Sequence, residues 1–176
     1  MSQRSQKESS PFPRTYKEGP FGTVHGGAVG RVWETGREIE IDVEGLKVVA
    51  GLLEGEAPRT CEAFLSILPF EGEVLPLRWS GDGFQTHHPR IERMAEDSEL
   101  VMENFSVLAA RGDISFWVRD RGVFFCYNYM YSRGITGEEP GNLFAHVRPE
   151  YYAQLYEIGR SVYTGGKKAI RITLIE

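Results

Sequence analysis

Residues 37–70 read REIEIDVEGLKVVAGLLEGEAPRTCEAFLSILPF, and the pattern of this stretch indicates the fold class. Ile39, Ile41 and Val43 alternate with acidic residues, which is the period of two expected of a half-buried strand. Glu44 and Gly45 then form a tight turn, and residues 46–53 form a second strand. The pair predicts a β-hairpin.

A helix is expected directly after this hairpin. Pro58 suits the first helical turn, because the N–H that proline lacks has no partner there in any case. Apolar residues then recur with helical spacing and make one stripe: Cys61, Phe64, Leu65 and Leu68. Cys61 on this stripe is interpreted as a small core residue, since no charge on that face would stabilise a thiolate. Pro69 ends the helix.

Further strands are expected along the rest of the chain, at residues 73–79, 83–87, 103–108, 114–118, 123–130, 142–147 and 168–175. Residues 89–98 are polar and fit a loop or a short helix, and residues 132–141 fit a glycine-bearing loop. Pro149 opens a second helix, which Gly165 and Gly166 end. Many strands with single helices after the second and before the last predict a mainly β fold, an antiparallel β-barrel capped by two α-helices.

The size and composition of the chain fit one globular domain. It has 176 residues, of which 41% are hydrophobic and 12% aromatic. Residues 1–30 combine polar residues with three prolines and show no sustained period, so we predict a flexible N-terminal arm there. Residues 31–176 are predicted to form the single barrel domain.

The charge balance argues against several classes of partner. Twenty Lys and Arg against 25 Asp and Glu give a net charge of −5, whereas nucleic acids and anionic membranes attract clustered positive charge. No apolar run is long enough to span a membrane, and residues 1–10 lack the apolar stretch of a secretory signal. We therefore expect a cytoplasmic protein with no nucleic-acid and no membrane partner.

Several local sequences resemble the cyclophilins. LEGEAPRT at residues 53–60 resembles the start of that family's first helix, and VFFC at residues 123–126 resembles its strand with a Phe-Phe pair. NLFAHV at residues 142–147 resembles its closing segment, and the order of elements matches over about residues 37–176. More closely, the chain resembles the bacterial cyclophilin-like proteins of the DUF3830 group, whose function is unknown. The resemblance implies a cyclophilin-like barrel.

The chain departs from cyclophilins at the block that carries their activity. A His-Arg, an apolar-Pro-Phe and a Gln-Gly-Gly-Asp are typical there, whereas this chain has LRWSGDGFQ at residues 77–85. By the resemblance, Arg78 and Phe125 would be the catalytic residues of a peptidyl-prolyl cis–trans isomerase. Such an enzyme binds the proline ring in an apolar pocket and donates a hydrogen bond from an arginine to the pyramidal nitrogen of the twisted amide. It thereby lowers a barrier of about 18–20 kcal/mol without a metal or a nucleophile.

An aromatic groove is the second feature that bears on function. In the strand over residues 123–130, Phe125, Tyr127 and Tyr129 share one face, and this face would form a groove floor if it lay outside the barrel. Such a stripe is more often core or subunit interface than a cleft. Apart from Arg78 and Phe125, the candidate groove residues are Trp79, Phe84, Gln85, His87, Tyr127 and Tyr129.

The sequence is compatible with three functions. The first is a module that binds a small amide- or carboxylate-bearing ligand or a peptide in this groove, without isomerase chemistry. The second is the isomerase with Arg78 and Phe125, acting on a proline-containing peptide. The third makes the exposed aromatics the interface of a homo-oligomer.

No metal and no cofactor are expected. His87 and His88 are neighbours on a strand, so their side chains point to opposite faces and cannot easily share one ion. His146 lies in an apolar strand and is interpreted as a structural histidine. The chain shows no phosphate-binding loop, dinucleotide fingerprint or Ser-His-Asp pattern.

Overall fold

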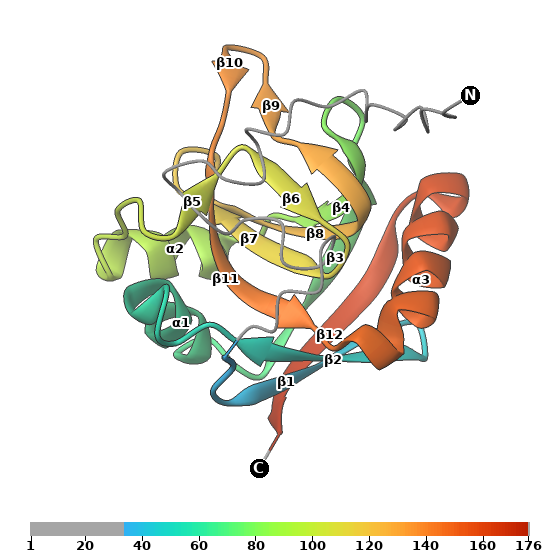
Figure 1. Cartoon of the computed structure of the whole chain (residues 1–176), viewed down its shortest axis with the longest axis horizontal. Coiled ribbons are helices and arrows are strands. Elements are labelled where there is room, and N and C mark those ends of the chain that lie inside the picture. Colours follow the sequence, from blue (N-terminus) through green and yellow to red (C-terminus); the bar gives the residue numbers. More distant parts are fainter. Residues whose placement is uncertain (1–33, 176) are drawn as a thin grey trace, which may run out of the picture.

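A computed structural model of the chain describes residues 34–175, and the predicted arm over residues 1–30 lies outside the described residues. Within the described range, eight antiparallel strands form a closed barrel in the order β2-β1-β12-β3-β4-β8-β7-β11, and β11 pairs with β2 to close it. Figure 1 shows the strands wrapped around a common interior. The predicted fold class, a mainly β cyclophilin-like barrel, is confirmed.

The eight strands of the barrel are β1 (Glu38–Val43), β2 (Leu46–Leu52), β3 (Phe70–Pro76), β4 (Gly81–Thr86), β7 (Asp113–Trp117), β8 (Gly122–Tyr131), β11 (Gly141–Val147) and β12 (Lys168–Ile175). The short strands β5 (Phe105–Ser106) and β6 (Leu108–Ala110) pair with β11 and β8. A separate hairpin of β9 (Arg133–Gly134) and β10 (Gly137–Glu138) projects from the barrel, within the segment expected to be a loop (Figure 1).

Helices cover the barrel from two sides. The helices α1 (Pro58–Leu65) and α2 (Pro89–Asp97) contact each other, while α3 (Tyr152–Gly165) lies along β2, β3, β4 and β8 on the other side (Figure 1). The structure thus has the two predicted helices and a third, α2, in the segment expected to be a loop or a short helix. None of the helices among residues 34–175 is long and apolar enough to cross a membrane.

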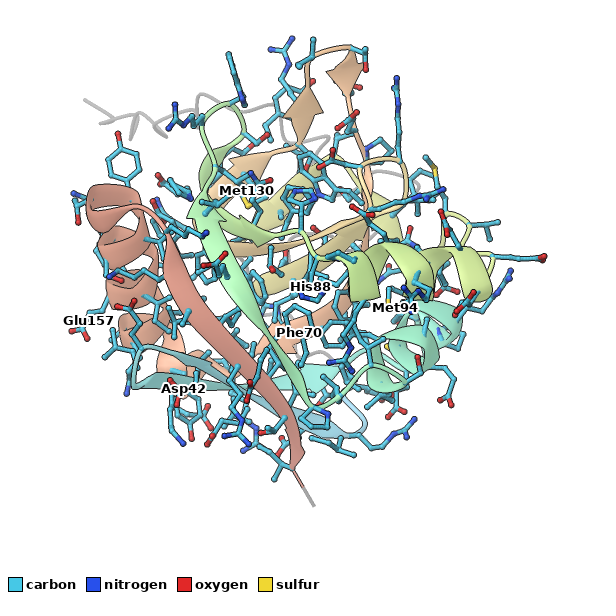
Figure 2. The ribbon with its side chains drawn as sticks, turned by 180° about the vertical axis from the view of Figure 1, so that it is seen from behind. Asp42, Phe70, His88, Met94, Met130 and Glu157 are labelled. Carbon is cyan, nitrogen blue, oxygen red and sulfur yellow. The ribbon has the colours of Figure 1, made fainter. Side chains whose placement is uncertain are left out.

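The start of α2 depends on His88. The Nδ1 atom of His88 accepts a hydrogen bond from the backbone N–H of Arg90, at 3.1 Å, and Pro89 occupies the first helical turn. Figure 2 shows His88 beside Phe70, and their rings pack edge to face with centroids 5.4 Å apart. His88 therefore links α2 to the barrel core.

Strand β8 is buried on both faces over residues 122–127. Phe125 is 1% exposed and stacks on Phe84 inside the barrel, with ring centroids 4.8 Å apart, and Tyr127 belongs to the same core. Phe124 and Cys126 point the other way, into a second apolar cluster on the outer side of the sheet. The expectation that Phe125, Tyr127 and Phe84 line a groove is therefore wrong. The alternation of side chains along a strand shows which residues share a face. It does not show which face points into the barrel when both faces are apolar and buried.

A core position for Phe125 makes a test of this assignment possible. Replacing Phe125 with Ala should lower the free energy of unfolding by about 3–5 kcal/mol, because the change removes a ring from a closed interior. Chemical denaturation measures this loss. The matched control is Tyr163→Ala, an aromatic truncation on α3 where the side chain is 60% exposed. Equal losses in the two variants would contradict the assignment of Phe125 to the core.

Candidate functional site

An open cleft of about 490 Å³ lies on the outer side of the β7–β8 sheet. The loop between β3 and β4 and the β9–β10 hairpin both contribute to its walls, and the turn between β7 and β8 contributes Arg119 and Asp120. Pockets that bind small molecules have volumes in the range of roughly 300–1,000 Å³. The cleft is therefore large enough for a ligand of that size.

The floor of the cleft is aromatic. The rings of Trp117 and Phe124 stack with centroids 3.8 Å apart and planes inclined by 10°. His87 packs edge to face against Phe124 at 5.7 Å, and Trp117 Nε1 donates a hydrogen bond to Ser115 Oγ at 3.2 Å. Each ring is thus held by at least one partner, and the floor is fixed by the sheet beneath it.

Two glycines make room for these rings. A Cβ atom at Gly141 would lie 2.4 Å from Trp117 Cδ1, and a Cβ atom at Gly122 would lie 2.4 Å from His87 Cε1. Contacts this short do not occur, so each ring rests directly on backbone that only glycine leaves uncovered. The positions of both rings depend on residues that carry no side chain.

Three arginines line the cleft of a chain whose net charge is negative. Arg119 Nε lies 3.8 Å from Glu139 Oε1, and the Arg133 guanidinium lies 5.5 Å from the centre of the Tyr131 ring. Arg78 is exposed and has no hydrogen bond or ion pair to any residue in the described part of the chain. Arg78 is therefore the cation with the fewest competing contacts for an anionic ligand.

His87 is held by two oxygen atoms at the same cleft. Its Nε2 atom lies 3.2 Å from Gln85 Oε1 and 3.4 Å from Asp120 Oδ2. A carboxylate oxygen only accepts hydrogen bonds, so the interaction with Asp120 requires a proton on Nε2. These contacts fix the orientation of the imidazole ring at the cleft wall.

Ser80 joins the two segments that form the cleft walls. Its hydroxyl donates to the backbone oxygen of Arg133 at 3.0 Å and accepts from the Arg133 N–H at 3.1 Å, and its own backbone oxygen accepts from the Tyr131 N–H at 2.8 Å. Ser80 is buried. The loop that carries Arg78 and the hairpin that begins at Arg133 are therefore fixed to each other.

Half of the residues predicted for the site lie together in the structure. Arg78, Trp79, Gln85 and His87 line the cleft, whereas Phe84, Phe125 and Tyr127 are in the barrel core. Tyr129 is partly exposed on β8 and does not line the cleft. The roles proposed for these residues stay predictions.

The sequence did not reveal the other residues that line the cleft, among them Trp117, Arg119, Asp120, Phe124 and Arg133. Phe124 could have been found from the alternation of β8, because it lies on the face opposite the one that we predicted to form the groove. The arginines gave none, since they reach the cleft only through the pairing of β7 with β8 and the fold of the hairpin.

A second polar cluster connects the barrel to α3. Asp113 Oδ1 lies 2.8 Å from His146 Nδ1, and His146 Nε2 lies 2.8 Å from the hydroxyl of Tyr152. The other oxygen of Asp113 accepts from the Ala110 N–H. Burial raises the pKa of Tyr152 to about 12, so this phenol keeps its proton at neutral pH. The buried polar groups satisfy one another, which fits the structural role expected of His146.

Both cysteines of the chain are buried. Burial raises the pKa of Cys61 to about 12 and also raises the pKa of Cys126, so neither thiol ionises readily. Among residues 34–175, no group of three or more His, Cys, Asp or Glu side chains is placed to hold a metal ion.

The closed barrel with its lateral cleft places the chain among cyclophilin-like folds, and its family follows from sequence. The profile of the family described as "Protein of unknown function (DUF3830)" matches residues 39–174, so the chain belongs to this family. No curated protein sequence matches the chain.

Two solved structures are similar to this chain in fold. McbB in complex with tryptophan shares 20% identity over 77% of this chain, with a TM-score of 0.61, and the chain spans 44% of the McbB chain. The hypothetical protein AF2241 from Archaeoglobus fulgidus shares 12% identity over 84% of this chain and all of its own, with a TM-score of 0.52. At these identities the likeness concerns the fold alone.

The glycine beneath Trp117 gives a test of the cleft floor. Gly141→Ala should displace the Trp117 ring and lower the free energy of unfolding by about 1–3 kcal/mol, because the added methyl overpacks a filled site. Near-UV circular dichroism and denaturation report the two effects. Gly55→Ala is the control, since a Cβ there meets nothing within 4 Å. An unchanged aromatic signal in Gly141→Ala would refute the described packing.

Proposed function

We propose that the cleft binds a small ligand that carries a carboxylate, and that Arg78 binds this carboxylate. The observation that carries the proposal is the placement of three guanidinium groups against two carboxylates, Asp120 and Glu139, at one cleft of a chain with a net charge of −5. Both carboxylates have partners of their own, Asp120 at His87 and Glu139 at Arg119. Arginine matches a carboxylate with two parallel hydrogen bonds, which an amide cannot accept in the same way. The arginines therefore favour a carboxylate over the amide that the sequence also allowed.

The aromatic floor supports the same proposal, because contact with it would increase the affinity of the cleft for a carboxylate ligand. An ion pair in open solvent contributes about 1 kcal/mol or less, so an exposed arginine alone would hold an anion weakly. A ligand that also covers part of the apolar wall gains the free energy of apolar burial and shields the ion pair from water. The ligand should therefore combine a charged group with an apolar body.

The other two functions have less support. An isomerase that used Arg78 and Phe125 together would need both side chains at one substrate, but Phe125 is enclosed in the barrel core. The homo-oligomer, like the cytoplasmic location, stays a prediction.

An indole carboxylate is a reasonable first probe. McbB, whose fold is similar, was solved in complex with tryptophan, which is a small carboxylate with an indole ring. Indole-3-acetate carries the same two groups without an ammonium group. Indole-3-acetamide keeps the ring and removes the charge, so the pair isolates the contribution of the carboxylate.

The test is a calorimetric titration of the purified protein with both compounds. Indole-3-acetate should bind at least about tenfold more tightly than the amide, a difference of about 1.4 kcal/mol, and Arg78→Ala should abolish that difference. Arg93→Ala, which removes an exposed arginine on α2 outside the cleft, should leave both affinities unchanged. Equal binding of acid and amide by the unaltered protein would overturn the proposal.

A further inference from the structure

Exposed apolar side chains gather at the cleft. Trp79 is 80% exposed, and Ile135 at the turn of the β9–β10 hairpin is fully exposed. Leu75 at the end of β3 is also exposed, and all three residues line the cleft. Side chains of this size rarely stand in water without a function when they are grouped around a concave site.

Each wall of the cleft carries a cation next to an apolar side chain. On the β3–β4 loop, Arg78 precedes Trp79, and on the hairpin, Arg133 stands two residues before Ile135. Ser80 fixes these two segments to each other through its hydrogen bonds to Arg133. The two pairs are therefore presented together, and a ligand between them meets charge and apolar surface on both sides.

The side chains of the cleft indicate what kind of apolar group the ligand carries. Trp79 and His87 are exposed rings at the cleft, whereas Trp117 and Phe124 are 3% and 1% exposed and support the floor beneath them. An exposed ring packs against another ring in stacked or edge-to-face geometry with a gain beyond area burial. A flexible alkyl chain would lose conformational freedom on binding and gain none of that specific contact. A flat ring fits the site better than a chain of similar size.

We infer that the ligand is an aromatic carboxylate, whose ring binds between Trp79 and Ile135 above the Trp117–Phe124 stack while its carboxylate binds Arg78. This inference rests on the proposed function, because it assumes that the cleft takes a carboxylate. It adds the class of the ligand and assigns ring recognition to two residues at the cleft rim.

The experiment compares indole-3-acetate with octanoate, a carboxylate whose apolar body is an alkyl chain. Indole-3-acetate should bind at least about tenfold more tightly than octanoate, a ratio that a calorimetric titration resolves easily. Trp79→Ala should remove most of this preference and Trp79→Phe should keep most of it, since phenylalanine retains a ring. Ile135→Ser should weaken the binding of indole-3-acetate several-fold.

The matched control is Tyr163→Ala, which truncates an exposed aromatic residue on α3 outside the cleft and should change neither affinity. Trp79 and Ile135 are exposed, so their variants should fold, and thermal melts verify this before the titrations. The changes in affinity can then be assigned to the cleft.

The outcomes separate this inference from the function on which it rests. Octanoate binding as tightly as indole-3-acetate, with no effect of Trp79→Ala, would overturn the aromatic ligand and leave a carboxylate site. Indole-3-acetamide binding as tightly as indole-3-acetate would overturn the carboxylate site itself. Absence of binding by all three compounds up to about 10 mM, an affinity below roughly 3 kcal/mol, would overturn both.

Discussion

The burial of β8 on both of its faces is the constraint on which the barrel and the cleft depend. On one face the Phe84–Phe125 stack fills the barrel, and on the other the Trp117–Phe124 stack supports the cleft floor. A shift of the strand by one residue would exchange the two sets of side chains and destroy both packings at once. The same strand therefore sets the stability of the fold and the shape of the candidate site.

The parts of the fold with a clear period were predictable from sequence. The first strand of the hairpin, Glu38–Val43, and the closing strand Lys168–Ile175 alternate apolar and polar residues, and the structure has both strands where the pattern places them. Helix α2 could not be distinguished from a loop, because its buried side consists only of Ile91, Met94 and Ala95 in an otherwise polar segment. The structure shows that the helix starts with His88 as its N-cap and Pro89 in its first turn. Residues of these types also occur in polar loops, so they did not predict a helix by themselves.

The candidate site was predictable only where its residues are close in sequence. Arg78 and Trp79 are neighbours in residues 77–85, the segment that stands where cyclophilins have their catalytic motif. A comparison of that segment with the motif is therefore enough to single them out. Arg119 and Arg133 come from a turn and a hairpin that reach the cleft through tertiary pairing, which no local pattern reports. The face of β8 could not be assigned, because the outer cluster makes that face as apolar as the inner one.

Much of the candidate site lies in segments that connect the strands of the barrel. The cleft is built from additions around the sheet, namely the β3–β4 loop, the β7–β8 turn and the β9–β10 hairpin, and such connecting segments vary without disturbing the core. Membership of a fold class therefore says little about the ligand. What argues for a ligand here is the coincidence of an aromatic floor, an arginine without a partner among the described residues and apolar side chains at the rim.

A crystal structure of the protein grown with indole-3-acetate would locate the ligand without assuming where it binds. We expect the carboxylate within hydrogen-bonding distance of the Arg78 guanidinium and the ring over the Trp117–Phe124 side of the cleft. A ligand bound elsewhere, such as beside α3, or bound in the cleft with its carboxylate away from all three arginines, would contradict this expectation.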